Sequence, residues 1–467
     1  MVKMKQILSS LLAASMLCSV CGCSMTVGTD KTELLKEAII YTLPLMMVKA
    51  TEIKVTNTET AGSNQAPVNQ LVQAQSLATA MSTDVVTPNV DTIYTQAFLD
   101  LHQDAVIIEL PKTDRFCTMQ FLDAYTNTIT VIDCMTFKND LETMIITGPD
   151  WQGEIPADMT QIKSPTGMVW LIGRTICYNN EDVVHVHEVQ NRMDMYTLTA
   201  YKNGTTDEKP AGEFVEEENF NPRDFVLSRT MEQYFEMANR LMLQNPPAKS
   251  DRRVMKKFAA VNIGPGMEFD ASVFGSEEEI AALWKKSLQD VVAQVTAACA
   301  NFQVTNGIWQ MFGDPIADWG TEYGYRAGVA LFGLGANPTS VAIYPKTEVD
   351  SEGNTLVGTN QYVIHIDADA FPPIRENGFW SITAYNSNDY LIDNELDRYA
   401  IKNTTPYILN EDGSLDIYVQ AEKPSDEKML ANWLPVSDDS FHLYMRVYLP
   451  EESVLQDTWT MPSVTKK

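Results

Sequence analysis

The chain has 467 residues, of which 45% are hydrophobic and 21% are charged, as in an ordinary globular protein. At about 150 residues per domain, this length allows roughly three domain-sized units. The formal net charge of −28 excludes nucleic acid as a partner, because affinity for nucleic acid depends on Lys and Arg side chains that neutralise phosphates.

Residues 1–23 have the pattern of an export signal followed by a lipidation site. Two lysines precede an apolar stretch, residues 7–17, that is too short to span a bilayer as a helix. The letters VCGC at residues 20–23 are similar to a bacterial lipobox, in which the last cysteine becomes lipidated. We therefore expect an exported lipoprotein, anchored through Cys23 on the periplasmic or cell-surface side of a membrane. The alternative is a plain secretory signal that is cut near the same place.

Residues 24–80 are predicted to form a helical N-terminal segment. Asp30 is placed to cap a helix over residues 31–50, in which Pro44 is expected to cause a kink or a break. A polar connector follows over residues 56–67.

Residues 81–200 are predicted to form the first β unit. Short runs rich in β-branched and aromatic residues alternate with turn residues about every ten positions, a spacing typical of an antiparallel β-sandwich or jelly roll. A helical pattern follows over residues 181–198. The β runs cover residues 104–111, 115–122, 127–137, 143–151 and 166–178.

Four cysteines follow Cys23, and export would permit disulfides among them. Cys117 and Cys134 lie on two adjacent β runs and would be nearly opposite each other in a hairpin. They form either a disulfide or, the interpretation that we favour, two buried free thiols. Cys177 and Cys299 are the other two, and no CxxC pair follows the signal, which argues against a zinc or thioredoxin-type site.

Residues 225–305 change to a helical period, and residues 306–467 return to a β pattern. Ser276 stands before three glutamates as a helix cap. PYILNEDGSLDIYVQ, residues 406–420, predicts a β-hairpin around Asp-Gly. The predicted fold is therefore α+β, with two mainly antiparallel β-sandwich or jelly-roll-like units joined by a helical segment.

Sequence motifs of several enzyme classes are absent or incomplete. The chain has neither a GxSxG elbow nor a P-loop. GLGANP at residues 333–338 begins like a dinucleotide loop but carries Pro338 in place of the last glycine, so a tight turn is the better interpretation. His187-Glu188 is followed by Asn191 where a zinc protease needs His, which leaves His185 and His187 as surface or core residues. We expect neither a metal nor a cofactor.

A set of polar residues is embedded in the apolar β runs, and leaving one buried without a partner costs about 1–3 kcal/mol. These residues therefore either form structural ties or face a cleft. A structural tie is the simpler explanation for each residue, whereas the whole set indicates at least one cluster in a cleft. Its members are Asn89, Asp91, Tyr94, Asp123, Tyr125 and Asn127 in the first unit and Trp380, Tyr385, Asn394, Arg398, Tyr399, Asn432, Trp433 and Arg446 in the second.

These residues lie in motifs that resemble two bacterial domains of unknown function. TPNVDTIYTQAFLDL (87–101) and RFCTMQFLDAYTNTI (115–129) resemble the domain numbered 1254. GVALFGLGANP (328–338), FPPIRENGFWSITAYN (371–386) and MRVYLPEESVLQDTW (445–459) resemble the domain numbered 1214. The resemblance covers most of the chain after residue 60 and implies two β-sandwich units, the first jelly-roll-like, joined through a helical segment. It implies no activity, since a fold does not by itself supply one.

The sequence indicates a protein that binds a small molecule or glycan in a cleft of its β units without transforming it. Neither a nucleophile–base pair nor a set of metal ligands is evident, and aromatic residues beside planar polar ones suit sugars or apolar ligands. The predicted ligand-binding residues are Asn89, Asp91, Tyr94, Asp123, Tyr125, Trp380, Trp433 and Arg446.

One alternative is a carbohydrate-active enzyme that performs β-elimination on uronic acids. Arg398 or Asn394 would neutralise the substrate carboxylate. Tyr385 would serve as acid/base and His365 as a base. Glycoside hydrolysis would instead need two carboxylates about 5–10 Å apart, with Asp91 and Asp123 as candidates.

A second alternative is a structural or assembly lipoprotein without a ligand. This alternative predicts a broad exposed apolar patch and no pocket.

Overall fold

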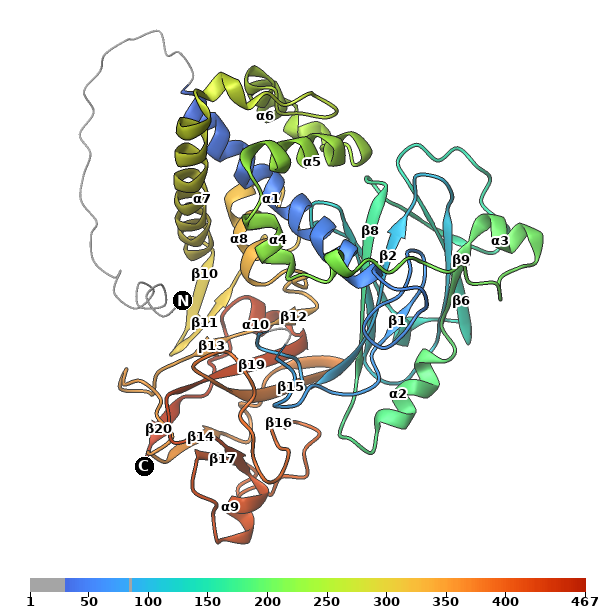
Figure 1. Cartoon of the computed structure of the whole chain (residues 1–467). Coiled ribbons are helices and arrows are strands. Elements are labelled where there is room, and N and C mark those ends of the chain that lie inside the picture. The colour runs from blue at the N-terminus through green and yellow to red at the C-terminus, as the bar shows by residue number, and fades with distance from the viewer. Residues whose placement is uncertain (1–29, 84–85) are drawn as a thin grey trace.

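The computed structural model describes residues 30–83 and 86–467, so the predicted signal segment and Cys23 lie outside the described residues. The predicted α+β class is confirmed (Figure 1). One β unit is built from strands within residues 72–197, the other from strands within residues 303–466, and a helical layer packs beside them. In the described part of the chain, each helix is too short or too polar to cross a membrane.

The first β unit consists of two facing, mainly antiparallel sheets. One sheet has the strand order β1-β2-β8-β4-β5 and the other β7-β6-β3-β9, in which β6 and β7 run parallel. The strands are β1 (Val72–Gln73), β2 (Thr92–Asp100), β3 (Val106–Pro111), β4 (Cys117–Asp123), β5 (Thr128–Asp133), β6 (Leu141–Thr147), β7 (Thr160–Lys163), β8 (Met168–Ile176) and β9 (Asp194–Thr197).

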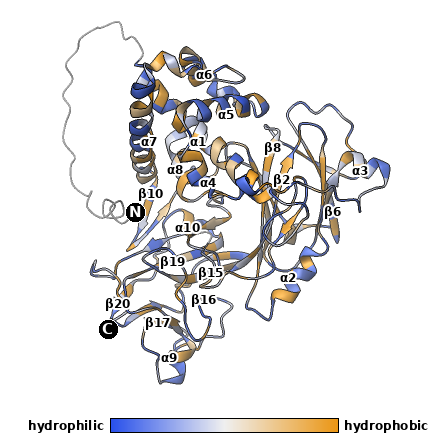
Figure 2. Ribbon diagram, in the orientation of Figure 1, coloured by the Kyte–Doolittle hydropathy of each residue, from blue (hydrophilic) through white to orange (hydrophobic). Residues whose placement is uncertain are grey.

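The larger of these sheets is covered on both faces. Leu171 and Phe121 share a hydrophobic core with the facing sheet. On the opposite face, Phe98 and Trp170 stack with ring centroids 5.3 Å apart and join the core of the helical layer. For this reason β8 is buried at all of its positions instead of alternating between buried and exposed residues. Figure 2 shows hydrophobic colour along β8.

The helical layer combines stretches that are far apart in the sequence. Its first helix, α1 (Lys31–Thr56), contacts α4, α7 and α8 and shares one core with them (Figure 1). The predicted N-terminal segment and the predicted helical insert therefore form one layer. The other helices of this layer are α4 (Pro222–Leu227), α5 (Met231–Gln244), α6 (Arg252–Phe258), α7 (Glu277–Ala300) and α8 (Tyr323–Phe332).

Both predicted helix caps are present. The Asp30 side chain accepts a hydrogen bond from the backbone of Thr32 at 2.9 Å, and Ser276 forms a reciprocal capping box with Glu279. The helix does not break at Pro44, because residues 41–48 are all buried in the helical layer. This packing compensates for the backbone hydrogen bond that proline cannot donate.

The second β unit is also built from two sheets. One has the order β10-β11-β13-β19-β15-β16, with β12 also paired to β19, and the other has the order β18-β17-β14-β20. Ile382, Met445 and Ile364 contribute to the core of this unit. The strands are β10 (Gln303–Asn306), β11 (Trp309–Phe312), β12 (Ala342–Ile343), β13 (Lys346–Thr347), β14 (Tyr362–Ile366), β15 (Ile374–Asn386), β16 (Ala400–Lys402), β17 (Leu415–Gln420), β18 (Trp433–Pro435), β19 (Phe441–Pro450) and β20 (Val464–Lys466).

The helix predicted over residues 181–198 is wrong in its second half. Helix α2 covers Val183–Gln190, and β9 then adds a strand to β3. Pairing with a strand that lies about 90 residues earlier outweighs the local helical pattern. The remaining short helices are α3 (Leu198–Asn203), α9 (Glu427–Ala431) and α10 (Glu452–Leu455).

The hairpin predicted over residues 406–420 is wrong in its first arm. Strand β17 pairs with β14 and with β18, which are distant in sequence. The side chain of Asn432 instead bonds to both backbone groups of Ile408, at 2.8 Å each, and holds this arm beside β17. The Asp-Gly turn itself is present, with Gly413 at a φ of 86°.

Candidate functional site

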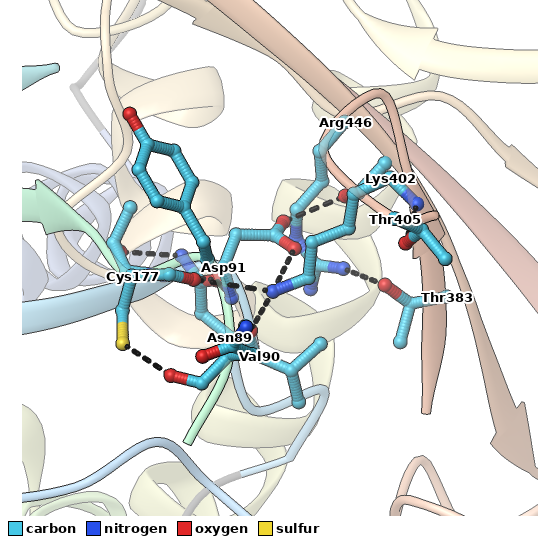
Figure 3. Close-up of polar contacts among 12 residues, drawn as sticks. Asn89, Val90, Asp91, Cys177, Thr383, Lys402, Thr405 and Arg446 are labelled. Atoms are coloured by element: carbon cyan, nitrogen blue, oxygen red, sulfur yellow. Dashed lines mark hydrogen bonds and ion pairs between the residues drawn. The ribbon is translucent and has the colours of Figure 1, made fainter. Parts of the chain in front are cut away.

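A buried polar cluster joins the two β units at the point where the residues before β2 meet β15, β16 and β19 (Figure 3). Four of the predicted ligand-binding residues lie here, together with one predicted catalytic residue. We call this set the junction cluster: Asn89, Asp91, Tyr94, Ser381, Thr383, Tyr385, Lys402, Arg446 and Tyr448.

Asn89 connects the two units through its side-chain amide. The amide nitrogen donates to the hydroxyls of Tyr448 at 2.9 Å and Tyr94 at 3.2 Å, which belong to different β units. The amide oxygen accepts the backbone N–H of Asp91 at 2.7 Å, the pattern of an Asx turn. The Pro-Asn pair therefore shapes the entry to β2 and holds that entry against β19.

Asp91 is fully buried and interacts with two strands of the other unit. Its Oδ2 accepts a hydrogen bond from Ser381 at 2.6 Å, and its Oδ1 lies 3.6 Å from the ammonium nitrogen of Lys402. Lys402 is only 8% exposed and also donates to the carbonyl of Val90 at 2.6 Å (Figure 3). Each buried charge depends on the other, because an unpaired charge in such a place is costly.

Arg446 and Tyr385 hold the residues that directly precede Asn89. The guanidinium of Arg446 donates to the Tyr385 hydroxyl at 2.7 Å and to the carbonyl of Thr87 at 3.2 Å. The Tyr385 hydroxyl donates to the carbonyl of Pro88 at 2.7 Å. Burial raises the pKa of Tyr385 to about 12, so the phenol stays protonated at neutral pH. These contacts make the junction cluster a clamp between the two β units.

The GLGANP segment, residues 333–338, is a tight turn, as predicted. It is hydrogen-bonded to Arg174 on β8, in the sheet that also contains β2. Gly335 has a φ of 84°, and a Cβ there would lie 2.7 Å from the side chain of Ile172. The buried Arg174 donates to the Gly335 carbonyl at 2.8 Å and to Asn337 at 2.9 Å. The segment therefore closes against β8.

Two other predicted ligand-binding residues, Asp123 and Tyr125, lie apart from the junction cluster. Asp123 accepts the backbone N–H groups of Tyr125 and Asn127 at 2.8 and 2.9 Å and shapes the turn after β4. Burial raises the pKa of Asp123. The Tyr125 hydroxyl donates to the carbonyl of Asn245, which ties the first β unit to the helical layer.

The two predicted ligand-binding tryptophans are buried in the second β unit. Trp380 is 2% exposed and Trp433 is 3% exposed. The indole of Trp433 donates to the carbonyl of Gln420 at 2.8 Å. Neither ring presents a face on which a sugar could stack, so the structure does not bring them to a ligand site.

The predicted catalytic residues do not converge. Tyr385 is in the junction cluster, whereas Arg398 donates to the carbonyls of Leu430, Ala431 and Trp433. Asn394 anchors the loop before β16 by bonding to the carbonyls of Ile392 and Arg398, and the exposed His365 lies on β14. A hydrogen bond to Asp416 raises the pKa of His365.

A cleft of about 890 Å³ lies elsewhere between the two β units. One wall comes from the segment before β4 and from α2, and the other from the first part of β15. All of its lining residues are polar or charged except Met135 and Val189. The lining is Lys112, Thr113, Asp114, Arg115, Met135, His185, Glu188, Val189, Arg192, Glu376 and Asn377.

Two arginines of this cleft are held in place by carboxylates. Arg115 makes a two-pronged ion pair with Asp182, at 2.8 and 3.1 Å. Arg192 pairs with Asp140 at 2.7 Å. Within the described chain, no group of three or more His, Cys, Asp or Glu residues is arranged to hold a metal ion.

Sequence reasoning missed this cleft because its residues share no motif. His185 was predicted to be a surface or core residue, Glu188 belonged to an incomplete zinc-protease motif, and Glu376 comes from a distant strand. The ion pair between Arg115 and Asp182 marks this cleft in the structure, but the sequence gives no signal of it because the two residues are 67 positions apart.

The architecture defines a protein of two β units with a helical layer packed beside them. Each β unit contains a segment that matches a known domain model. Residues 68–197 match the model of a protein of unknown function, DUF1254, and residues 341–452 match that of a second, DUF1214. The chain therefore contains these two domains, and they follow each other in this order. This confirms the resemblance seen in the sequence motifs. No curated protein matches the sequence.

A solved structure shows the same fold as this chain. The crystal structure of the VPA0106 protein from Vibrio parahaemolyticus is 22% identical, with a TM-score of 0.69, over 93% of this chain and 99% of that one. An uncharacterized protein from Burkholderia cenocepacia is 11% identical, with a TM-score of 0.42, and each chain is covered to 94%. This chain and the VPA0106 protein therefore share their fold over nearly their whole lengths.

Proposed function

We propose that this protein is an exported lipoprotein that binds a small polar molecule or a glycan in the cleft between its two β units, without transforming it. The observation that carries the proposal is the cleft of about 890 Å³, which is lined almost entirely by polar side chains. The cleft is open to solvent, and its volume is within the range of small-ligand sites.

The chemistry of the lining favours a ligand rich in hydroxyl groups. Lys112, Arg115 and Arg192 supply hydrogen-bond donors, whereas Asp114, Glu188 and Glu376 supply acceptors. Sugars need both kinds of group because each hydroxyl donates and accepts. The mixture of charges also suits acidic or amino sugars.

The ion pairs around the cleft support binding by reducing its entropic cost. Arg115 is held by Asp182, and its side chain is only 12% exposed. Groups that are already ordered lose less freedom when a ligand arrives. The predicted catalytic residues Tyr385, Arg398 and Asn394 are engaged elsewhere by the protein itself, which supports binding without conversion.

The proposed localisation depends on the first residues of the chain. A lipid on Cys23 would attach the protein to a membrane, which is therefore its proposed partner. We expect the Cys23→Ser variant, expressed in a bacterium with lipoprotein processing, to lose incorporation of a labelled fatty acid. Cys299→Ser is the matched control and should retain the label. Equal labelling of the Cys23→Ser variant would contradict the anchor.

The ligand hypothesis is tested with a panel of neutral and acidic oligosaccharides. At least one member should raise the melting temperature without producing the absorbance of an unsaturated product. Replacing Arg192 or Glu188 with alanine should then weaken its binding about tenfold, or roughly 1.4 kcal/mol for one lost hydrogen bond to a charged group, as measured by calorimetry.

Lys257→Ala is the matched control for Arg192→Ala. Lys257 pairs with Glu37 on the helical layer at 3.1 Å and is as exposed as Arg192. It should leave the affinity unchanged. If no oligosaccharide binds, or if the Arg192 and Glu188 variants bind as tightly as the unmodified protein, the cleft is not the site.

A further inference from the structure

Cys117 is the first residue of β4, and Cys134 directly follows the last residue of β5 in a short 3-10 turn. The strand register pairs Thr118 with Asp133, so the adjoining positions bring the two cysteines close together, and their side chains share a hydrogen bond. Both side chains belong to the core between the two sheets of the first β unit and therefore point to the same face. Opposed residues of antiparallel strands have Cα atoms about 4.5–5.5 Å apart, within the span of about 4.4–6.8 Å that a disulfide bridges.

The two thiols also interact with each other. Their shared hydrogen bond lowers the pKa of Cys117 and raises the pKa of Cys134. The hydroxyl of Thr175 donates to the sulfur of Cys117 at 3.4 Å. Because the Thr175 hydroxyl would stabilise a negative charge on its sulfur, Cys117 is the better nucleophile of the pair, and Cys134 is placed to react with it next.

We propose that Cys117 and Cys134 form a cross-strand disulfide when the protein meets a disulfide oxidant. The sulfur of Cys117 attacks the oxidant's disulfide, forms a mixed disulfide and releases one thiol. The sulfur of Cys134 then attacks the sulfur of Cys117 and releases the second thiol. The two protein thiols are oxidised, the oxidant is reduced to two thiols, and each protein proton passes to one of them.

The position of β5 gives an oxidant access to the buried pair. Both cysteines have no exposed surface in the folded protein. However, β5 is the edge strand of its sheet, and all of its residues are only half-buried. An edge strand can separate locally at a lower free-energy cost than the whole unit needs to unfold. The pair can therefore react after folding as well as during it.

The crosslink would also join two segments of the cleft wall. Arg115 and Met135 line the cleft and lie next to the cysteine pair along the chain. The inference itself does not depend on the proposed ligand, because bond formation is measured directly.

The other cysteines provide internal controls. Cys177 and Cys299 belong to separate core clusters, and each sulfur donates to a backbone carbonyl. Among the described residues, neither of them shares its cluster with another cysteine. Cys177→Ser and Cys299→Ser should leave the reaction of the pair intact.

The test uses the purified full chain, incubated with oxidised or with reduced glutathione and then alkylated with iodoacetamide. Trypsin releases both cysteines in one fragment, residues 116–138, since the nearest basic residues are Arg115 and Lys138. After oxidation this fragment should be two hydrogens lighter and unalkylated. After reduction it should carry two alkyl groups.

The oxidised protein should also melt about 5 °C higher, because the bond constrains a short loop of the unfolded chain. Cys117→Ser should abolish both the mass change and this redox-dependent shift, whereas Cys177→Ser should keep both. Two alkylated cysteines after oxidation, glutathione that stays attached to Cys117, or equal melting of the two forms would each overturn the proposal.

Discussion

The Asp91→Ala variant is expected to lose about 3–5 kcal/mol of unfolding free energy, because it leaves a buried cation without its partner. Lys402 is 8% exposed, and its ammonium group lies 3.6 Å from the carboxylate that the change removes. Ser381 would lose its acceptor at the same time. Urea unfolding followed by tryptophan fluorescence measures the effect.

Most of this loss of unfolding free energy should come from the unpaired charge of Lys402, and less from the missing contacts of Asp91. A double variant, Asp91→Leu with Lys402→Met, removes both charges while keeping most of the volume. It should recover a large part of the stability, because well-packed apolar residues often replace a buried ion pair at little cost. Asp207→Ala, at an exposed position between α3 and α4, is the matched single change and should stay within about 0.5 kcal/mol of the parent protein.

The Asp91→Ala variant also distinguishes two roles for the junction cluster, joining the two β units and binding a ligand. If Asp91 mainly joins the two β units, Asp91→Ala should unfold more readily whether or not a ligand is present. Normal unfolding combined with lost oligosaccharide binding would contradict the clamp and place the ligand at the junction cluster instead of the cleft.

Gly358→Ala is expected to destabilise the protein by about 3 kcal/mol or more, because a side chain at this position would collide with the backbone. A Cβ on residue 358 would lie 1.7 Å from the carbonyl oxygen of Ser437. Gly358 also bonds through its N–H to the carbonyl of Asp439 at 3.0 Å, so the two segments cannot simply separate. Reduced yield of folded protein and a lower melting temperature are the measurements.

Gly62→Ala is the control for this substitution. The nearest atom to a Cβ at residue 62 is a carbonyl oxygen at 3.8 Å, an ordinary contact. This change should alter the stability by no more than about 0.5 kcal/mol. A Gly358→Ala variant as stable as Gly62→Ala would show that the crossing of these two segments can relax, contrary to the packing described above.

Predictions from local signals agree with the structure. The caps at Asp30 and Ser276 are correct because a capping side chain bonds to the helix that it precedes. The strands of both β units follow the runs of β-branched and aromatic residues. Predictions failed where a distant segment was decisive, as at residues 194–197, which pair with β3, and at Ile408, whose backbone bonds to Asn432.

For the candidate sites too, the sequence showed single residues but not their distant partners. Asn89, Asp91 and Arg446 were recognisable as polar residues in apolar surroundings, and they do meet. Their partners are about 290–360 residues away along the chain. The sequence therefore could not show that these residues bond to one another between the two β units and do not line a cleft. The cleft was invisible because its residues are ordinary surface positions until two β units place them face to face.

By itself, then, the sequence determined the two β units, the helical segment between them and the two domains of unknown function, since these depend on residues that are close together along the chain. Only the tertiary structure decided which buried polar groups neutralise one another and where the cleft lies. The physical reason is that hydrogen bonds and ion pairs act over a few ångströms in space, and folding alone brings those partners within reach.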